Sequence, residues 1–75
     1  MHSSVKYLFE MIGDATSKAA LAAIFSRTAV EELEIGNLLE GYNCILKAQH
    51  QINDAIRALG QVMAEMPEKE FGIEL

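Results

Sequence analysis

His50 and Asp54 form the pair of residues in this sequence whose types and spacing come nearest to a chemical site. They are four positions apart, so a helix would place them on one face, where such a pair holds a metal ion or forms an ion pair. No second histidine or cysteine is close enough to complete a metal site, because Cys44 would lie on a different side of the helix. We therefore expect a surface pair, with no metal and no other cofactor.

The single cysteine and the acidic clusters are expected to be structural as well. Cys44 has no neighbouring group of cations that would favour a reactive thiolate, so we expect a small apolar residue at the boundary of an apolar face. Glu31 and Glu32 are expected in the first turn of a helix, where the helix dipole stabilises acidic groups. The glycines form no phosphate-binding loop, and no Ser/His/Asp or Cys/His arrangement is present. The chain is therefore predicted not to be an enzyme.

Composition narrows the classes of partner. The net charge is −5, and the six basic residues are scattered singly, which argues against nucleic acid and acidic lipid. The longest apolar run, Ala19 to Phe25, is too short to cross a membrane, for which about 20 residues are needed. One cysteine and the lack of a secretory signal pattern predict a cytoplasmic location. With 51% apolar residues in only 75, the protein is expected to bury apolar surface against other protein.

Two short helices are predicted in the first third of the chain, at about residues 4–12 and 15–26. Their apolar sets are Val5, Leu8, Phe9 and Ile12 in the first and Leu21, Ile24 and Phe25 in the second. On one straight helix these sets would lie roughly 160° apart, so that helix would be apolar on two opposite sides. A break at Gly13 lets both sets face one core, and we favour this break over the straight helix.

One long helix is predicted from about residue 29 to residue 66. Thr28 and Glu31 have the spacing of a capping box, which marks a helix start, and Pro67 would stop the helix. The alternative is a start near Asn37, with residues 29–35 as a separate turn, because glycines inside a helix are unfavourable.

The long helix carries a coiled-coil heptad. Its a and d positions are Ile35, Tyr42, Gln49, Ile56, Met63 and Leu38, Ile45, Ile52, Leu59, Met66. The small residues Gly41, Ala48 and Ala55 at g would let a neighbouring helix approach closely, and Gln49 is a candidate for fixing register. Because the two short helices are too short to cover the long one, part of its apolar face is expected to be a protein interface. The predicted interface residues are Leu38, Tyr42, Ile45, Gln49, Ile52, Ile56, Leu59 and Met63.

The predicted fold is thus all-α, a two- or three-helix chain forming a helical hairpin or bundle that oligomerisation completes. Residues 1–66 would form one helical domain and residues 67–75 a C-terminal tail. In length and in its amphipathic C-terminal helix the chain resembles the small helical co-chaperones of bacterial secretion systems.

The expected function is that of a non-catalytic protein–protein interaction module, such as an adaptor, a small chaperone subunit or an oligomerisation element. Its partner would be a second copy in a homodimer or another helical protein. The alternative is an acidic inhibitor, of the kind found in phages and mobile elements, that blocks a basic nucleic-acid-binding protein.

Overall fold

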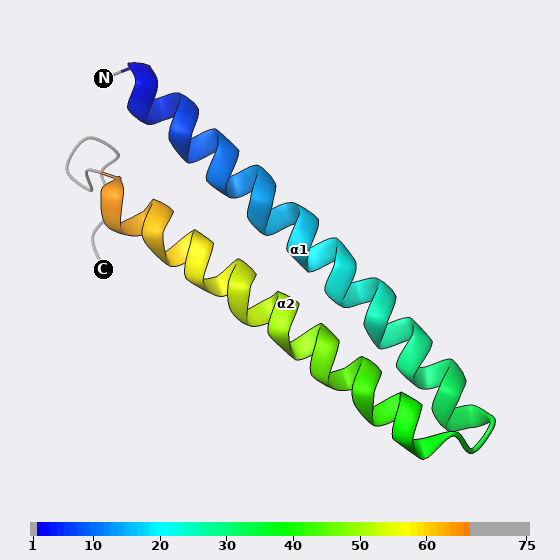
Figure 1. The fold of residues 1–75 in the computed structure, drawn as a ribbon. Coiled ribbons are helices and arrows are strands. Elements are labelled where there is room, and N and C mark those ends of the chain that lie inside the picture. The colour runs from blue at the N-terminus through cyan, green and yellow to red at the C-terminus, as the bar shows by residue number, and fades with distance from the viewer. Residues whose placement is uncertain (1, 67–75) are drawn as a thin grey trace.

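The computed structural model describes residues 2–66, which form an antiparallel pair of long helices (Figure 1). Helix α1 spans His2–Glu34 and helix α2 spans Leu38–Glu65. The hairpin is flat and about one helix thick, with extents of 52 × 26 × 12 Å. The predicted all-α class and the helical hairpin are therefore confirmed. The predicted tail, residues 67–75, lies outside the described residues.

A tight turn at Gly36 joins the two helices. Gly36 has φ +83°, a left-handed conformation that glycine adopts without the steric cost that a Cβ brings. Its N–H donates to the carbonyl of Leu33 (3.0 Å), and the N–H of Asn37 donates to that of Glu32 (2.8 Å). This pair of bonds is a Schellman motif, which satisfies carbonyl groups left open at the end of α1.

Asn37 links the end of α1 to the start of α2. Its side-chain oxygen accepts a hydrogen bond from the N–H of Glu40 at 3.5 Å and so caps α2. Its Nδ2 donates to the carboxylate of Glu32 at 2.8 Å. The alternative start of the second helix near Asn37 is therefore correct, whereas the residues before it continue α1 up to Glu34.

Two predicted boundaries in the first half of the chain are wrong. The two short helices and the first part of the long helix are one continuous helix, which passes through Gly13 without a break. Thr28 does not cap a helix, because its hydroxyl donates to the carbonyl of Ile24 (3.1 Å), four residues earlier; the hydroxyl of Thr16 donates to the carbonyl of Ile12 (2.9 Å) in the same way. The break falls at Gly36 instead, where the Schellman motif and the Asn37 cap satisfy the ends of both helices.

The predicted stop before Pro67 agrees with the structure. The last residue of α2 is Glu65, and Met66 follows with φ −84° and ψ 128°. This extended conformation is the one that a residue preceding proline prefers.

The seam between the helices is built from small residues. The side chains of α1 that turn toward α2 recur at heptad spacing: Leu8, Met11, Ala15, Lys18, Ala22, Phe25, Ala29 and Glu32. Those of α2 are Gly41, Cys44, Ala48, Gln51, Ala55, Ala58 and Val62. At Gly41 an added Cβ would lie 2.6 Å from the side chain of Leu33, so the helices approach closely there. The hairpin is thus held by close backbone approach rather than by large buried side chains.

Candidate protein-binding surface

The predicted interface residues lie together on one side of α2, and the structure leaves them exposed. Their spacing alternates between four and three residues, which aligns them along one face of the helix. Among the apolar members, exposure runs from 41% at Ile52 to 69% at Leu38. Gln49 is exposed among them.

The cause of this exposure differs from the one predicted. The first helix is not too short to cover the second, because α1 has 33 residues and α2 has 28. The large side chains are exposed because α1 packs on the neighbouring positions of α2, where Gly41, Ala48 and Ala55 allow closer approach. The predicted plan of two short helices and one long helix is therefore absent from residues 2–66.

Helix α1 extends the exposed apolar surface. In an antiparallel pair, the positions that flank the seam on one side of both helices lie on the same broad face. We call the following residues the apolar face: Val5, Phe9, Ile12, Thr16, Ala19, Ala23, Ser26, Val30 and Leu33 of α1, with Leu38, Tyr42, Ile45, Gln49, Ile52, Ile56, Leu59 and Met63 of α2. None of these residues is charged.

The contribution of α1 to this face was missed from the sequence because its apolar residues were assigned to an internal core. Phe9 is 69% exposed and Val30 is 56% exposed. The signal that could have found them is the alanine heptad, since Ala15, Ala22 and Ala29 recur every seven residues and mark the seam directly. Placing the seam there puts Phe9 and Val30 outside it.

The apolar face is large for a protein of this size. At roughly 150–250 Å² for a large apolar or aromatic side chain, the exposed fractions of its large residues amount to about 1,000 Å². The largest apolar patch on a typical monomer is about 300–600 Å². This face therefore has the size of an interface rather than of ordinary surface.

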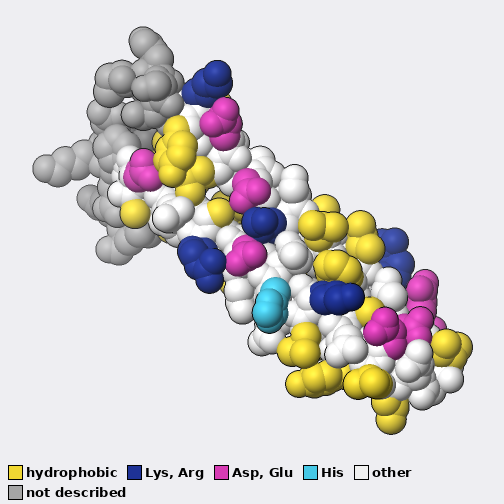
Figure 2. Space-filling model, in the orientation of Figure 1, with side chains coloured by type: hydrophobic (Ala, Val, Ile, Leu, Met, Phe, Trp, Pro, Cys, Tyr) yellow, Lys and Arg dark blue, Asp and Glu magenta, His cyan; other side chains and the backbone are white. Residues whose placement is uncertain are grey.

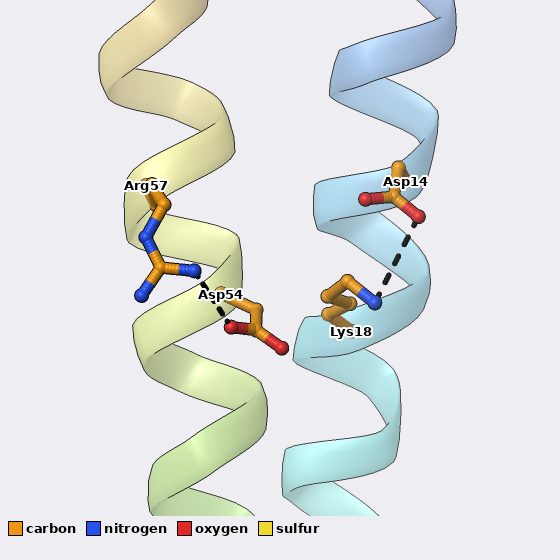
Figure 3. A network of polar contacts seen from close by, with 4 residues as sticks. All are labelled: Asp14, Lys18, Asp54 and Arg57. Atoms are coloured by element: carbon orange, nitrogen blue, oxygen red, sulfur yellow. Dashed lines mark hydrogen bonds and ion pairs between the residues drawn. The ribbon is translucent and has the colours of Figure 1, made fainter.

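The opposite broad face, called the polar face below, carries charged side chains together with the exposed Leu21 and Ile24, and it holds a shallow open cleft of about 460 Å³. Tyr7, Glu10, Asp14 and Lys18 of α1 line it together with Asp54, Arg57 and Gln61 of α2. Lys18 lies 4.0 Å from Asp14, and Arg57 lies 3.1 Å from Asp54, so each of the two aspartates has a basic neighbour on its own helix (Figure 3). Such exposed pairs contribute little to stability.

Charged side chains of both signs are mixed along the hairpin. Figure 2 shows this mixture over one face of the molecule, with apolar side chains between the charged ones. Across the seam, the Lys47 ammonium lies 5.8 Å from the centre of the Phe25 ring, within the range of a cation–π contact. No extended region of one sign dominates the face in Figure 2.

The residues that the sequence offered as candidates for chemistry, His50, Asp54 and Cys44, form no chemical site in the part of the chain that the structure describes. Asp54 pairs with Arg57 and not with His50, so the predicted His50–Asp54 surface pair is wrong. Cys44 is buried in the seam as a small apolar residue. Within residues 5–66, no three His, Cys, Asp or Glu side chains are grouped as a metal site would need.

The acidic cluster near residue 31 lies at the opposite end of a helix from the one predicted. Glu31, Glu32 and Glu34 are in the last turns of α1 and not in the first turn of a helix. The dipole at a helix C-terminus is unfavourable for acids, so these carboxylates are not there to stabilise the helix end. The hydrogen bond from Asn37 to Glu32 gives one of them a partner.

Gln51 is the uncharged polar residue in the α2 half of the seam, a position that sequence reasoning did not single out. Its Oε1 is buried and has no hydrogen-bond partner. Gln49, the amide that the sequence did single out, lies on the apolar face instead. The heptad that identified Gln49 is displaced by one position from the residues that contact α1.

Replacing Gln51 with leucine is expected to stabilise the protein by about 1 kcal/mol, because it removes an unsatisfied buried oxygen and keeps the side-chain volume. Thermal and urea unfolding at one fixed protein concentration would measure the change. Gln61→Leu is the matched control, since Gln61 is exposed on the same helix, and it should change stability little. A loss of stability in Gln51→Leu would show that Oε1 has a partner in solution.

Neither helix within residues 2–66 has the length and apolar character needed to cross a membrane. Comparison of the chain with protein-family models, with curated proteins and with solved structures finds no match.

Proposed function

We propose that this protein is a non-catalytic interaction module that binds other protein through its apolar face. The observation that carries this proposal is the uncharged surface of about 1,000 Å² along one side of both helices. A standard interface buries about 800 Å² on each partner, so the face is large enough for a stable complex. An adaptor, a small chaperone subunit or an oligomerisation element would each use such a surface.

The chemistry of the face favours protein over membrane or nucleic acid. Helices that lie on membranes combine an apolar side with many lysines and arginines on the other. Here the net charge is −5, and the other broad face mixes acids and bases. Nucleic-acid binding requires clustered basic residues, and the apolar face has no charged residue at all.

The alternative role, an acidic inhibitor of a basic protein, has less support. Such an inhibitor needs a continuous row of acids to imitate phosphates. On the polar face, Asp14 and Asp54 lie next to Lys18 and Arg57, which offset their charge. The apolar face would also have no part in binding a basic surface.

The proposal can be tested by asking whether protein covers the apolar face inside the cells that produce this chain. A photo-crosslinking amino acid is placed at Ile56, which is 61% exposed on the apolar face, or at Asn53, which is exposed on the outer edge of α2. We expect protein adducts from position 56 and few from position 53. Equal or absent labelling at the two positions would contradict the proposal.

A second prediction uses charge to block the same face. Ile52→Glu/Leu59→Glu is expected to reduce the adducts from position 56 at least ten-fold, because burying a carboxylate against an apolar partner is strongly unfavourable. Asn53→Glu/Gln61→Glu adds the same charge away from the apolar face and should leave the adducts intact. Circular dichroism of both double variants checks that the helices persist. Adducts that survive Ile52→Glu/Leu59→Glu in a folded protein would place binding elsewhere.

A further inference from the structure

The hairpin has too little internal core to account for its fold. Its buried apolar residues are mainly alanines, and among residues 5–66 no large side chain is less than 2% exposed. Domains below about 70–80 residues rarely gain enough stability from one core and often rely on oligomerisation. Cys44 is the only cysteine, so no intrachain disulfide compensates. The apolar face is the surface on which a partner would add to the burial that the seam provides.

The area of the apolar face matches that of a permanent dimer. Two copies pressed face to face would bury about 2,000 Å² in total, which is at the lower end of the range for obligate homodimers. Interfaces of that kind are also more apolar than transient ones. A second copy is the partner that is present whenever this chain is made.

The distribution of charge also permits self-association. Two chains of net charge −5 repel each other, but the apolar face itself brings no charged groups together. The acids of residues 5–66 all lie outside the apolar face, most of them on the polar face and the outer edges, on the far side of such a dimer. Water and salt screen charges that are so placed.

The sizes of the side chains along the apolar face indicate which helix of a second copy would pack on which. Near the middle of α1 the face consists of small side chains: Thr16, Ala19, Ala23 and Ser26. Along α2 the side chains of the apolar face are large at almost every position, from Leu38 to Met63. Packing is tight when large side chains of one helix meet small side chains of another. Each α2 therefore fits best over the α1 of the other copy.

We propose that a second copy of this chain covers the apolar face, forming a four-helix bundle in which each α2 packs on the partner's α1. This inference rests on the function proposed above. The two-fold axis then runs parallel to the helices, and both Gly36 turns lie at the same end. Placing α2 on α2 instead would set the small stretches of the two α1 helices opposite each other and leave a void.

The polar residues of the apolar face agree with this arrangement. Gln49 is the one polar side chain that α2 contributes, and in the hairpin it lies level with the middle of α1. With both turns at the same end, Gln49 would meet the stretch of small residues of the other copy. There the Ser26 hydroxyl, which donates its proton to the carbonyl of Ala22 (2.8 Å), can accept a hydrogen bond from the Gln49 amide. With the turns at opposite ends, Gln49 would face isoleucines of the second α2 and lose hydrogen bonding.

Light scattering after size exclusion, on the full chain over a range of concentrations, tests the second copy. We expect a mass of twice the 8.3 kDa of one chain. Ile56→Glu should weaken self-association at least ten-fold, and Asn53→Glu, three residues away on the outer edge, should not. A folded wild-type protein with the mass of one chain would overturn the inference. Adducts from position 56 to a different protein would in that case still support the proposed function.

The orientation is tested with one spin label on each chain. The label is placed at Glu34, which is exposed next to the turn, in a Cys44→Ala background. With both turns at one end, the two labels should lie within roughly 30 Å, the width of a four-helix bundle. A separation close to the 52 Å length of the hairpin would overturn the proposed pairing of α2 with α1.

Discussion

Replacing Ala22 with leucine is expected to lower the free energy of unfolding by about 1–3 kcal/mol, the usual cost of forcing a large side chain into a closely packed site. Ala22 is 3% exposed and lies in the middle of the seam. A leucine there would push α1 away from α2 and open contacts on either side. Urea unfolding followed by circular dichroism, at one fixed protein concentration, measures the loss.

Ala20→Leu is the control for this prediction. Ala20 is two residues away and exposed on the outer edge of α1, where a leucine meets no other part of the hairpin. Leucine and alanine are both good helix formers, so this substitution should change stability by only a few tenths of a kcal/mol. If Ala22→Leu were as well tolerated as Ala20→Leu, the alanine seam would not be the contact between the helices.

The prominence of small residues explains why the sequence predicted the exposed face of α2 but not its packing. The apolar heptad from Leu38 to Met63 is real, and it was expected to meet another chain. Hydrophobic periodicity locates the largest side chains, and in most proteins those side chains form the core. Here the core consists of the smaller residues beside them. The small size of Ala48 and Ala55 predicts a close approach of another helix. It does not by itself predict that these alanines, rather than the neighbouring isoleucines, are buried against α1.

The assumption that large apolar residues form the core also explains the wrong prediction of a helix break at Gly13. The apolar residues of α1 point in two directions, which seemed incompatible with one straight helix. The structure has that straight helix, with Phe9 69% exposed on the apolar face and Ile24 50% exposed on the other. Each apolar set gives only one side chain to the seam, Leu8 and Phe25, and the alanines provide its closest contacts, so neither set has to turn inward as a whole. A break was required only if the large residues formed an internal core.

The end of α1 could be identified from the sequence only as an alternative. Gly36-Asn37 has the residue types of a helix C-terminus followed by an N-cap. The capping-box spacing of Thr28 and Glu31 competed with this signal. A capping box starts a helix only if the chain before it has left the helix. The residues from Ala19 to Ser26 are mostly good helix formers, so the helix continues through them to Thr28.

Substitution of two glycines by alanine is expected to give opposite results, and this contrast tests the topology in solution. Gly13→Ala should raise the free energy of unfolding by about 0.5–1 kcal/mol, since alanine favours a helix interior. An added Cβ at Gly13 meets nothing within 4 Å. Gly36→Ala should lower the free energy of unfolding by about 1–2 kcal/mol, because a Cβ is strained in the left-handed conformation.

The signs of the two changes separate the two possible folds. If the chain turned at Gly13, as the arrangement of large apolar residues suggests, Gly13 would hold the left-handed conformation and its alanine variant would be the damaging one. Because the turn is at Gly36, with φ +83°, the alanine substitution that lowers stability is the one at Gly36. Open space surrounds both positions, so neither result can be attributed to a clash. Thermal unfolding of the two variants at equal concentration therefore reports directly on where the backbone reverses.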